Sequence, residues 1–528
     1  MPVRLVSPRR PILRFQKPLF LLAILSLSLF ASAAQKGHDA TLTVGVQGGS
    51  GVAASDISVT LGGKGAALVA APVPKSLIVP DLQLDQYTTE LPEAVQSPII
   101  FVFDAMDTRE IEERDMRKHV LKFMADAAAK KQAVGLVMMY RDGVFAIHDY
   151  RMGSAVLAAA LAKANGGSAP SVPGAEQRVA IEAKLLAEFA KGTYSTQASD
   201  NTVLLTTLDA PVLMMQEVGA ALRDLPGRKA IVWVTAGVPF EIEERDHSLT
   251  THLELNSGVA VNGASVTSTK RTATDDQIRK LQPMWRATLN NLWDSGTAVY
   301  PVEARSNFSP PAGRVYTSTM TQVAEMTGGK AFYGSNDPSS FFNSIVSDNA
   351  NSIRVAFPIE GSNDNWQKLN VTSPKGKVFA PTGMFVPPDR SADDLRKNAI
   401  STALNSRFGF GGMPFRLTLG DQGASGAKKT VNFVVFLPPN AGFVDEKTGE
   451  INLDIAAVAY GKKSEKAGTM AAAVATKVPT EAVKQIGEMG SKLSQKIDLP
   501  PGDYTLRVVV RDNLNGRVGS IEARVEVK

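Results

Sequence analysis

Two aspartates and a threonine follow an apolar run and could together bind a cation. The run IIFVFD (99–104) ends at Asp104, and Asp107 and Thr108 come within the next four residues. Carboxylate and hydroxyl oxygens are the hard donors that Mg²⁺ and Ca²⁺ prefer. The same residues could instead cap a following helix, because Glu110 stands three residues after Asp107, as in a capping box. Both interpretations stay open at the level of sequence.

The elements around these residues predict a sheet edge that would present them to a ligand. PIIFVFD (98–104), AIVWVTAG (230–237) and TAVYPVEA (297–304) are apolar runs typical of strands buried on both faces, and helical stretches lie between them. Strands alternating with helices indicate βαβ units. We therefore expect an α/β fold with a doubly wound, mostly parallel sheet. Open sheets of this class bind ligands at the carboxyl ends of their strands.

Further candidate contact residues follow the later strands of this expected sheet. Thr235 ends the second run, and Glu303 and Arg305 follow the third. Residues 238–274 form a long polar insertion without clear periodicity, and they hold His247 and His252. These two histidines are five residues apart, not the four that would place two zinc ligands on one helical face. A solvated acidic loop or a contact loop are the remaining interpretations.

Four segments of this region resemble a von Willebrand factor A-like domain, and more closely the VWFA-related domain of exported acidobacterial proteins. They are FVFDAMDT (101–108), LRDLPGRKAIVWVTAGVP (222–239), AVYPVEAR (298–305) and VAEMTGGKAFYGSND (323–337). The resemblance implies a doubly wound domain flanked by β modules, with a role in protein–protein contacts. It does not identify the partner.

The same resemblance implies a degenerate metal-ion-dependent adhesion site. Asp104 matches the leading aspartate of the metal motif, and Thr108 matches its last hydroxyl. Met106 stands at the middle hydroxyl position, where a thioether is a poor ligand for Mg²⁺ or Ca²⁺. Ala236 stands where many A-domains have a second aspartate. We expect no resident cofactor, and Mg²⁺ or Ca²⁺ would be the ion if Asp104, Asp107 and Thr108 held one.

Strand patterns on either side of this region indicate smaller β modules. We expect a signal peptide over 1–34, an N-terminal β module and connector over 35–96, and the A-like domain over 97–350. A β segment over 351–386 and a linker over 387–398 would follow. A C-terminal β-sandwich of immunoglobulin or fibronectin type over 399–528 completes the division, because YTLRVVVRD (504–512) and SIEARVEVK (520–528) alternate clearly around an Asn-Gly turn.

The N-terminus predicts export. Basic residues precede the apolar stretch LFLLAILSLSLF (19–30), and the small residues of 31–33 fit a signal-peptidase site. The chain holds 57 basic and 52 acidic residues; the first 34 residues hold five basic ones and no acid, so the remainder has 52 of each. That balance gives no electrostatic case for nucleic-acid binding. The chain has no cysteine, which excludes disulfides and thiolate chemistry. No later apolar run is long enough to cross a membrane.

These observations favour an exported, non-enzymatic protein of the protein-binding or adhesion type, in the periplasm, on the cell surface or in the medium. The expected partner is another protein. A periplasmic hydrolase is an alternative, although no G-x-S-x-G elbow, P-loop or G-x-G-x-x-G motif is present. A structural envelope scaffold is a second alternative. Arg228 and Lys229, which precede a strand, could bind an anion or lie solvated in a turn.

Overall fold

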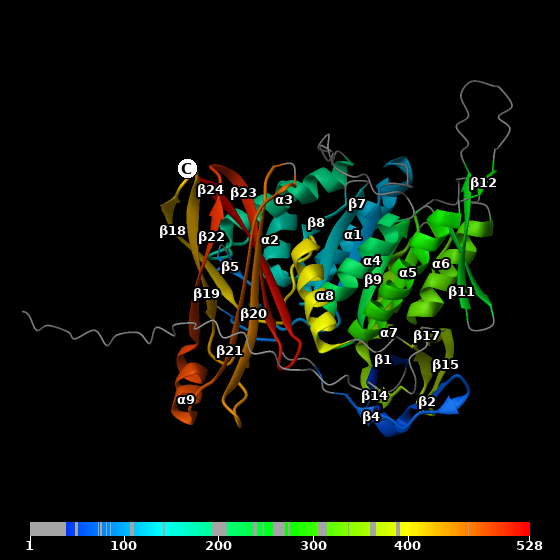
Figure 1. The fold of residues 1–528 in the computed structure, drawn as a ribbon. Coiled ribbons are helices and arrows are strands. Elements are labelled where there is room, and N and C mark those ends of the chain that lie inside the picture. Colours follow the sequence, from blue (N-terminus) through cyan, green and yellow to red (C-terminus); the bar gives the residue numbers. More distant parts are fainter. Residues whose placement is uncertain are drawn as a thin grey trace, which may run out of the picture. The chain divides into compact units, whose positions relative to one another are not determined.

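Five strands form a mixed sheet that holds the candidate residues (Figure 1). Its order is β13 (Thr297–Glu303), β9 (Lys229–Thr235), β6 (Ile99–Asp104), β7 (Val134–Tyr140) and β8 (Gly143–His148). The first four strands run parallel, and β8 pairs antiparallel with β7. Strands β6 and β9 are buried along their whole length, which their continuous apolar runs require.

Helices cover both faces of the mixed sheet. One face packs Phe101, Phe103 and their strand neighbours against α1 (Glu110–Ala129), α2 (Ser154–Ala164), α3 (Glu176–Lys191) and α7 (Ser339–Ala350). The other face packs Ile100, Val102 and Trp233 against α4 (Asp209–Leu222), α5 (Asp275–Ser295) and α6 (Arg314–Thr327). Alternate residues of each strand therefore serve two separate cores, as the period of two along a strand dictates.

Two antiparallel sheets join the beginning of the chain to the segment that follows α7. One has the order β16 (Lys377–Phe379), β1 (Asp39–Gln47), β14 (Ser352–Pro358) and β4 (Val69–Ala70). The other has the order β17 (Gly383–Phe385), β15 (Trp366–Thr372), β2 (Ser58–Leu61) and β3 (Lys64–Gly65). Strands predicted in separate segments, 35–96 and 351–386, thus pair with one another.

The C-terminal region folds as a β-sandwich. One sheet has the order β22 (Ser491–Leu499), β19 (Lys428–Leu437), β18 (Arg416–Ser425) and β5 (Tyr87–Thr88). The other has the order β21 (Lys466–Lys477), β20 (Glu450–Tyr460), β23 (Gly502–Asp512) and β24 (Val518–Val527). Phe433 of the first sheet and Val508 of the second share one buried core. Helices α8 (Ala392–Asn405) and α9 (Thr480–Met489) belong to this region, and α8 contacts β23 and β24.

The predicted fold class, a doubly wound, mostly parallel α/β fold, is wrong. Antiparallel pairing dominates: among the described residues, five sheets are wholly antiparallel and the sixth is mixed. The prediction failed because apolar runs reveal burial on two faces but not strand direction. Even in the mixed sheet, β8 pairs antiparallel with β7.

The 238–274 insertion also differs from its prediction. It carries strands β10 (Phe240–Arg245), β11 (Ser248–Asn256) and β12 (Lys270–Thr272), which form an antiparallel sheet. The apolar residues of β10 and β11 do alternate, as Phe240 and Ile242 and as Leu249, Leu253 and Leu255, but charged and hydroxyl residues outnumber them, so the strand signal is weak.

The structure is a computed structural model in which Ser32–Lys528 form one compact unit. It describes residues 39–47, 51–71, 73, 76–80, 82–84, 86–105, 110–140, 143–192, 209–235, 240–245, 248–256, 270–272, 275–304, 314–335, 337–359, 366–386, 391–462 and 464–528. Among these residues, no helix combines the length and apolarity that crossing a bilayer would need.

Candidate functional site

Three neighbouring parallel strands end on oxygen-bearing side chains at one edge of the mixed sheet. Strand β6 ends at Asp104, β9 at Thr235 and β13 at Glu303. Thr235 lies opposite Glu303 in the β9–β13 register, and Phe103 lies opposite Val234 in the β6–β9 register. The sequence folds in this way because parallel strands all present their carboxyl ends at the same edge. The structure therefore brings Asp104, Thr235 and Glu303 onto adjacent strand ends.

Asp104 and Thr235 are held together inside the protein. The Thr235 hydroxyl Oγ1 donates to Asp104 Oδ2 over 3.0 Å, and both residues are fully buried. A buried carboxylate needs such donors, because leaving its oxygens without hydrogen bonds would cost more than the bond itself returns. The pair consequently fixes the ends of β6 and β9 to each other.

Glu303 is half-buried and extends the edge toward the segment that follows α6. Its carboxylate Oε2 accepts from the backbone N–H of Gly334 over 3.2 Å, and its own N–H donates to Phe332 O over 3.0 Å. Tyr333 lies near this carboxylate; burial raises the pKa of Tyr333, and the charge of Glu303 raises it further. The Glu303 carboxylate therefore connects the end of β13 to the backbone of the segment that follows α6.

The described donors do not form a metal site by themselves. Asp104 and Thr235 supply one carboxylate and one hydroxyl, whereas Ca²⁺ takes six to eight oxygen ligands and Mg²⁺ takes six. In the part of the chain that the structure describes, no three His, Cys, Asp or Glu residues gather closely enough to hold an ion. These residues supply only part of the oxygen ligands that a cation needs. We therefore assign no role at this edge to a bound metal ion.

Several predicted residues lie outside the described residues. These are Asp107, Thr108, His247 and Arg305. Helix α1 begins at Glu110, so the capping alternative for Asp107 or Thr108 also falls outside them. The backbone of His252 lies in β11 opposite Glu241, but its side chain is not described. The roles predicted for these residues stay predictions.

Arg228 and Lys229 are both buried. The sequence allowed two interpretations for them, anion binding or solvation in a turn. Arg228 donates to the Tyr300 hydroxyl over 2.6 Å, to Asn349 Oδ1 over 2.8 Å and to the carbonyl of Gly328. Lys229 donates to Ser295 O over 2.5 Å. Burial lowers the pKa of Lys229 to about 7, and the charge of Arg354 lowers it too, against the raising effect of Asp224. Both side chains brace the opposite end of β9, so the solvated-turn interpretation is wrong.

Sequence reasoning missed a buried pair between two elements far apart in the chain. His148 Nδ1, at the end of β8, lies 2.7 Å from Glu182 Oε2 on α3, and both side chains are almost completely buried. No sequence signal links them, because they are 34 residues apart and neither belongs to a spaced motif. Next to His148 is a cavity of about 20 Å³, which has room for roughly one water molecule.

Comparisons with known proteins add no functional assignment. No family model and no curated protein matches the chain. Among solved structures, it is similar to proximal thread matrix protein 1 from the mussel byssus, at 12% identity and a TM-score of 0.24 over 48% of each chain. It is also similar to a point mutant of the PilB minor pilin from Streptococcus sanguinis, at 10% identity and a TM-score of 0.26, over 49% of this chain and 63% of that one. A third match is the N-terminal domain of TFIIH p34, at 12% identity and a TM-score of 0.25, over 48% of this chain and 96% of that one.

These likenesses are too weak to bear on fold or function. The chain spans about half of the first structure and under two thirds of the second. They give the resemblance to von Willebrand factor A-like domains no support.

Proposed function

We propose that the chain is an exported, non-enzymatic binding protein that contacts another protein through the carboxyl edge of the mixed sheet. The observation that carries the proposal is the alignment of Asp104, Thr235 and Glu303 on three adjacent strand ends. The resemblance to VWFA-related domains supports the same edge, and the signal-peptide pattern of residues 1–34 supports export.

The proposed contact does not depend on a metal ion. Oδ2 of Asp104 already accepts a hydrogen bond from Thr235, and the pair is buried. Glu303 is the more accessible of the three side chains, because it is half-buried where the other two are fully buried. We assign Asp104 and Thr235 to support of the edge and Glu303 to direct contact with the partner.

The hydrolase alternative gains no support from the one buried acid–histidine pair discussed above, His148–Glu182. The His148–Glu182 pair is buried, and the adjoining cavity holds too little space for a substrate. Catalysis would also require a nucleophile within reach of the base. This alternative therefore carries no separate proposal.

The proposal is tested by capture from the native envelope with matched variants. The variant Glu303→Gln removes the charge but keeps an oxygen that can accept from Gly334 N–H. The control Glu446→Gln removes an exposed charge from the loop between β19 and β20. We expect wild type and the control to retain one stoichiometric protein that Glu303→Gln retains at least tenfold less well, the loss expected for about 1.4 kcal/mol. Equal capture by all three proteins would contradict the proposal.

A further inference from the structure

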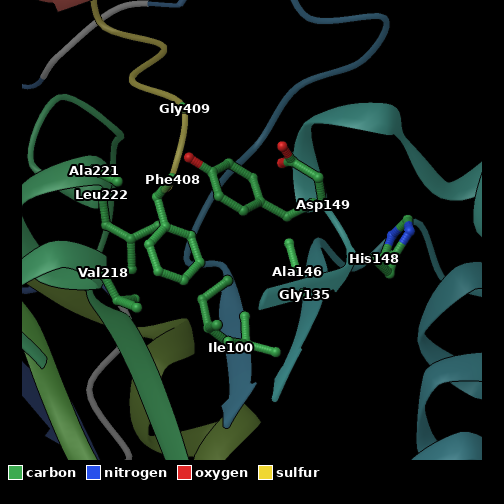
Figure 2. Close-up of a pocket in the computed structure, with 12 residues that line it drawn as sticks. Ile100, Gly135, Ala146, His148, Asp149, Val218, Ala221, Leu222, Phe408 and Gly409 are labelled. Carbon is green, nitrogen blue, oxygen red and sulfur yellow. The ribbon is translucent and has the colours of Figure 1, made fainter. Parts of the chain in front are cut away.

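The cavity beside His148 is filled by the chain itself. Figure 2 shows the ring of Phe408 among the residues that line this cavity, beside Val218 and Leu222. About 20 Å³ of free space remains, which is enough for roughly one water molecule. This cavity therefore offers no binding site, whereas one strand edge on the surface does.

Strand β21 has a long backbone edge that no other described segment covers. It pairs with β20 on one side and stands last in its sheet, so its other side is an edge. Among the described residues, no group of another segment forms a hydrogen bond with the backbone on that side. The pairing with β20 is regular from Gly468 to Lys477. Because strand N–H and C=O groups point alternately to the two sides, this edge presents a regular row of unpaired donors and acceptors.

The edge at the other end of the same sheet is covered. There, Ser520 N of β24 donates to Phe410 O over 2.9 Å, and Arg524 N donates to the Tyr87 hydroxyl over 3.3 Å. The chain thus supplies its own partners to the backbone of β24. It supplies none to the free edge of β21.

Strand β22, an edge of the facing sheet, is protected by charge instead. Lys492 and Lys496 are exposed along it. Lysine, proline and bulges are the devices by which proteins keep an edge from pairing with another strand. From Gly468 to Thr476, β21 has no charged residue, no proline and no bulge. Its edge is therefore open to an extended segment.

The side chains of β21 indicate what such a segment would carry. Met470 and Val474 are half-buried and pack against the sandwich core, whereas Thr469, Ala471 and Ala473 are exposed. Opposite residues of paired strands place their side chains on the same face of the sheet. A segment added to β21 would therefore place apolar residues beside Met470 and Val474 and polar residues between them.

The charges of β21 indicate what would flank the segment. Lys466 and Lys477 are the only charged residues of the strand, stand at its two ends, and are exposed. An acidic residue at each end of the segment would complement them. A second copy of the chain fits poorly. In an antiparallel pair of two β21 strands, Lys466 of each copy would lie near Lys477 of the other, and like charges across paired strands are destabilising.

We propose that β21 accepts an extended segment of another protein as an added strand, with alternating apolar and polar residues and an acidic residue at each end. The backbone edge supplies the hydrogen bonds, and the two lysines select the acidic flanks. This surface lies in the C-terminal sandwich. It goes beyond the contact proposed for the mixed sheet and does not depend on it.

The test uses the full chain and a labelled synthetic peptide of alternating valine and threonine with an aspartate at each end. Fluorescence anisotropy measures its binding at low salt. We expect saturable binding that is at least tenfold tighter than that of the same peptide with lysine at each end, because two attractive charge pairs replace two repulsive ones. A form methylated on every backbone nitrogen cannot donate to the edge and should not bind.

A charge exchange in the protein tests the position of the site. The variant Lys466→Glu/Lys477→Glu should reverse the preference and bind the lysine-flanked peptide more tightly, a gain that also shows that the variant folds. The matched control, Lys492→Glu/Lys496→Glu, changes two exposed lysines of β22 and should keep the preference of wild type.

Three outcomes would overturn the proposal. The first is no saturable binding of the acid-flanked peptide, or equal binding of its methylated form. The second is a preference for acidic flanks that the β21 variant retains. The third is a wild-type dimer, seen by sedimentation, that the acid-flanked peptide dissociates, because the edge would then belong to a second copy of the chain.

Discussion

The hydrogen bond from Thr235 to Asp104 joins the ends of β9 and β6 inside the protein. Both residues are fully buried, so the bond replaces contacts that water would otherwise make. At the scale of single residues, this pair sets the geometry of the proposed contact edge. We expect the loss of this hydrogen bond to lower the free energy of unfolding more than it weakens binding of the partner.

We therefore predict that Thr235→Val destabilises the protein by ~1–2 kcal/mol, because the buried Asp104 carboxylate loses one donor while the volume is kept. Thr235→Ser keeps the hydroxyl and should cost less. Urea unfolding of the two variants measures the difference. A Val variant as stable as wild type would show that the bond contributes nothing.

Cations provide a second residue-level test. The Asp104–Thr235 pair supplies one carboxylate and one hydroxyl, and no three acidic or histidine side chains gather among the described residues. We therefore predict that Mg²⁺ and Ca²⁺ at millimolar concentration leave the melting temperature unchanged, as does a chelator. The account would be contradicted by a stabilisation with either ion that Asp104→Ala abolishes.

Lys229 gives the chain a stability that depends on pH. Its pKa in the folded protein is about 7, below the ordinary value of 10.5, because burial disfavours the charged amine. Between these two pH values the unfolded chain binds a proton that the folded protein has released. The free energy of unfolding should therefore rise with pH between pH 7 and pH 10.5, by up to roughly 1.4 kcal/mol per pH unit. Below pH 7 the buried amine is charged in the folded protein, and its destabilising effect is complete.

The variant Lys229→Met should remove this contribution. We expect it to be more stable than wild type at pH 6 and to lose that advantage progressively toward pH 10. Denaturant unfolding of both proteins at pH 6, 8 and 9.5 measures the difference, in which all other titrating groups cancel. A stability difference that is the same at every pH would refute the assignment.

At the scale of elements, the segment after α6 is held against β13 by a close backbone approach. A Cβ at Gly329 would lie 1.9 Å from the carbonyl oxygen of Val299. This contact positions the residues up to Gly334, whose N–H reaches Glu303. The edge therefore depends on a turn that admits no side chain.

We predict that Gly329→Ala destabilises the protein by ~2 kcal/mol or more, since backbone must move to relieve the overlap. The matched control is Gly487→Ala in α9, where a Cβ meets nothing within 4 Å and alanine should stabilise by ~0.5–1 kcal/mol. Thermal or urea unfolding compares them. The same sign of effect at both positions would contradict this interpretation.

Element by element, the sequence predicted strands better than their pairing. The strand at 98–104 and the alternating strands of 504–512 and 520–528 were found, because burial on one or two faces leaves a direct pattern in residue type. Strand direction leaves no such pattern, so the antiparallel sheets were underestimated. The pairing of β1 with β14 joins residues more than 300 positions apart, and no local signal encodes it.

The sequence predicts which residues of the candidate site lie at strand ends, but it does not predict the contacts between them. Each of Asp104, Thr235 and Glu303 stands at the end of an apolar run, which predicts its place at a strand end, and the structure places the three on adjacent strands. The bond between Thr235 and Asp104 depends on which strands are neighbours, which spacing does not reveal. The burial of Arg228 and Lys229 was missed for the same reason: their polar partners come from distant segments.

At the scale of the whole molecule, residues before the mixed sheet tie it to the C-terminal sandwich. Thr89 N donates to Phe415 O over 3.0 Å, and the Thr89 hydroxyl donates to Met413 O over 2.8 Å. Arg416 donates from Nη2 to Glu90 Oε1 over 3.0 Å, and the Glu90 side chain is 1% exposed. From these contacts we expect the two regions to unfold together.

We predict that Arg416→Met lowers the free energy of unfolding by ~1–3 kcal/mol, because the buried Glu90 carboxylate loses its charged donor. The transition should stay single, with calorimetric and van't Hoff enthalpies equal. Arg524→Met, which removes an exposed arginine from β24, is the control and should be near neutral. Two separate transitions in wild type would contradict a shared unfolding unit.

The central claim is that the carboxyl edge of the mixed sheet contacts a partner protein, and the absence of cysteine from the chain makes it directly testable. Ser335→Cys places a unique thiol next to Gly334, and Ser494→Cys places one on an exposed position of β22. Each is labelled with a photo-cross-linker and incubated with the native envelope. The account predicts one protein cross-linked from position 335 and not from 494, competed by unlabelled wild type but not by Glu303→Gln. Cross-linking from 494 alone, or competition by Glu303→Gln as strong as by wild type, would contradict it.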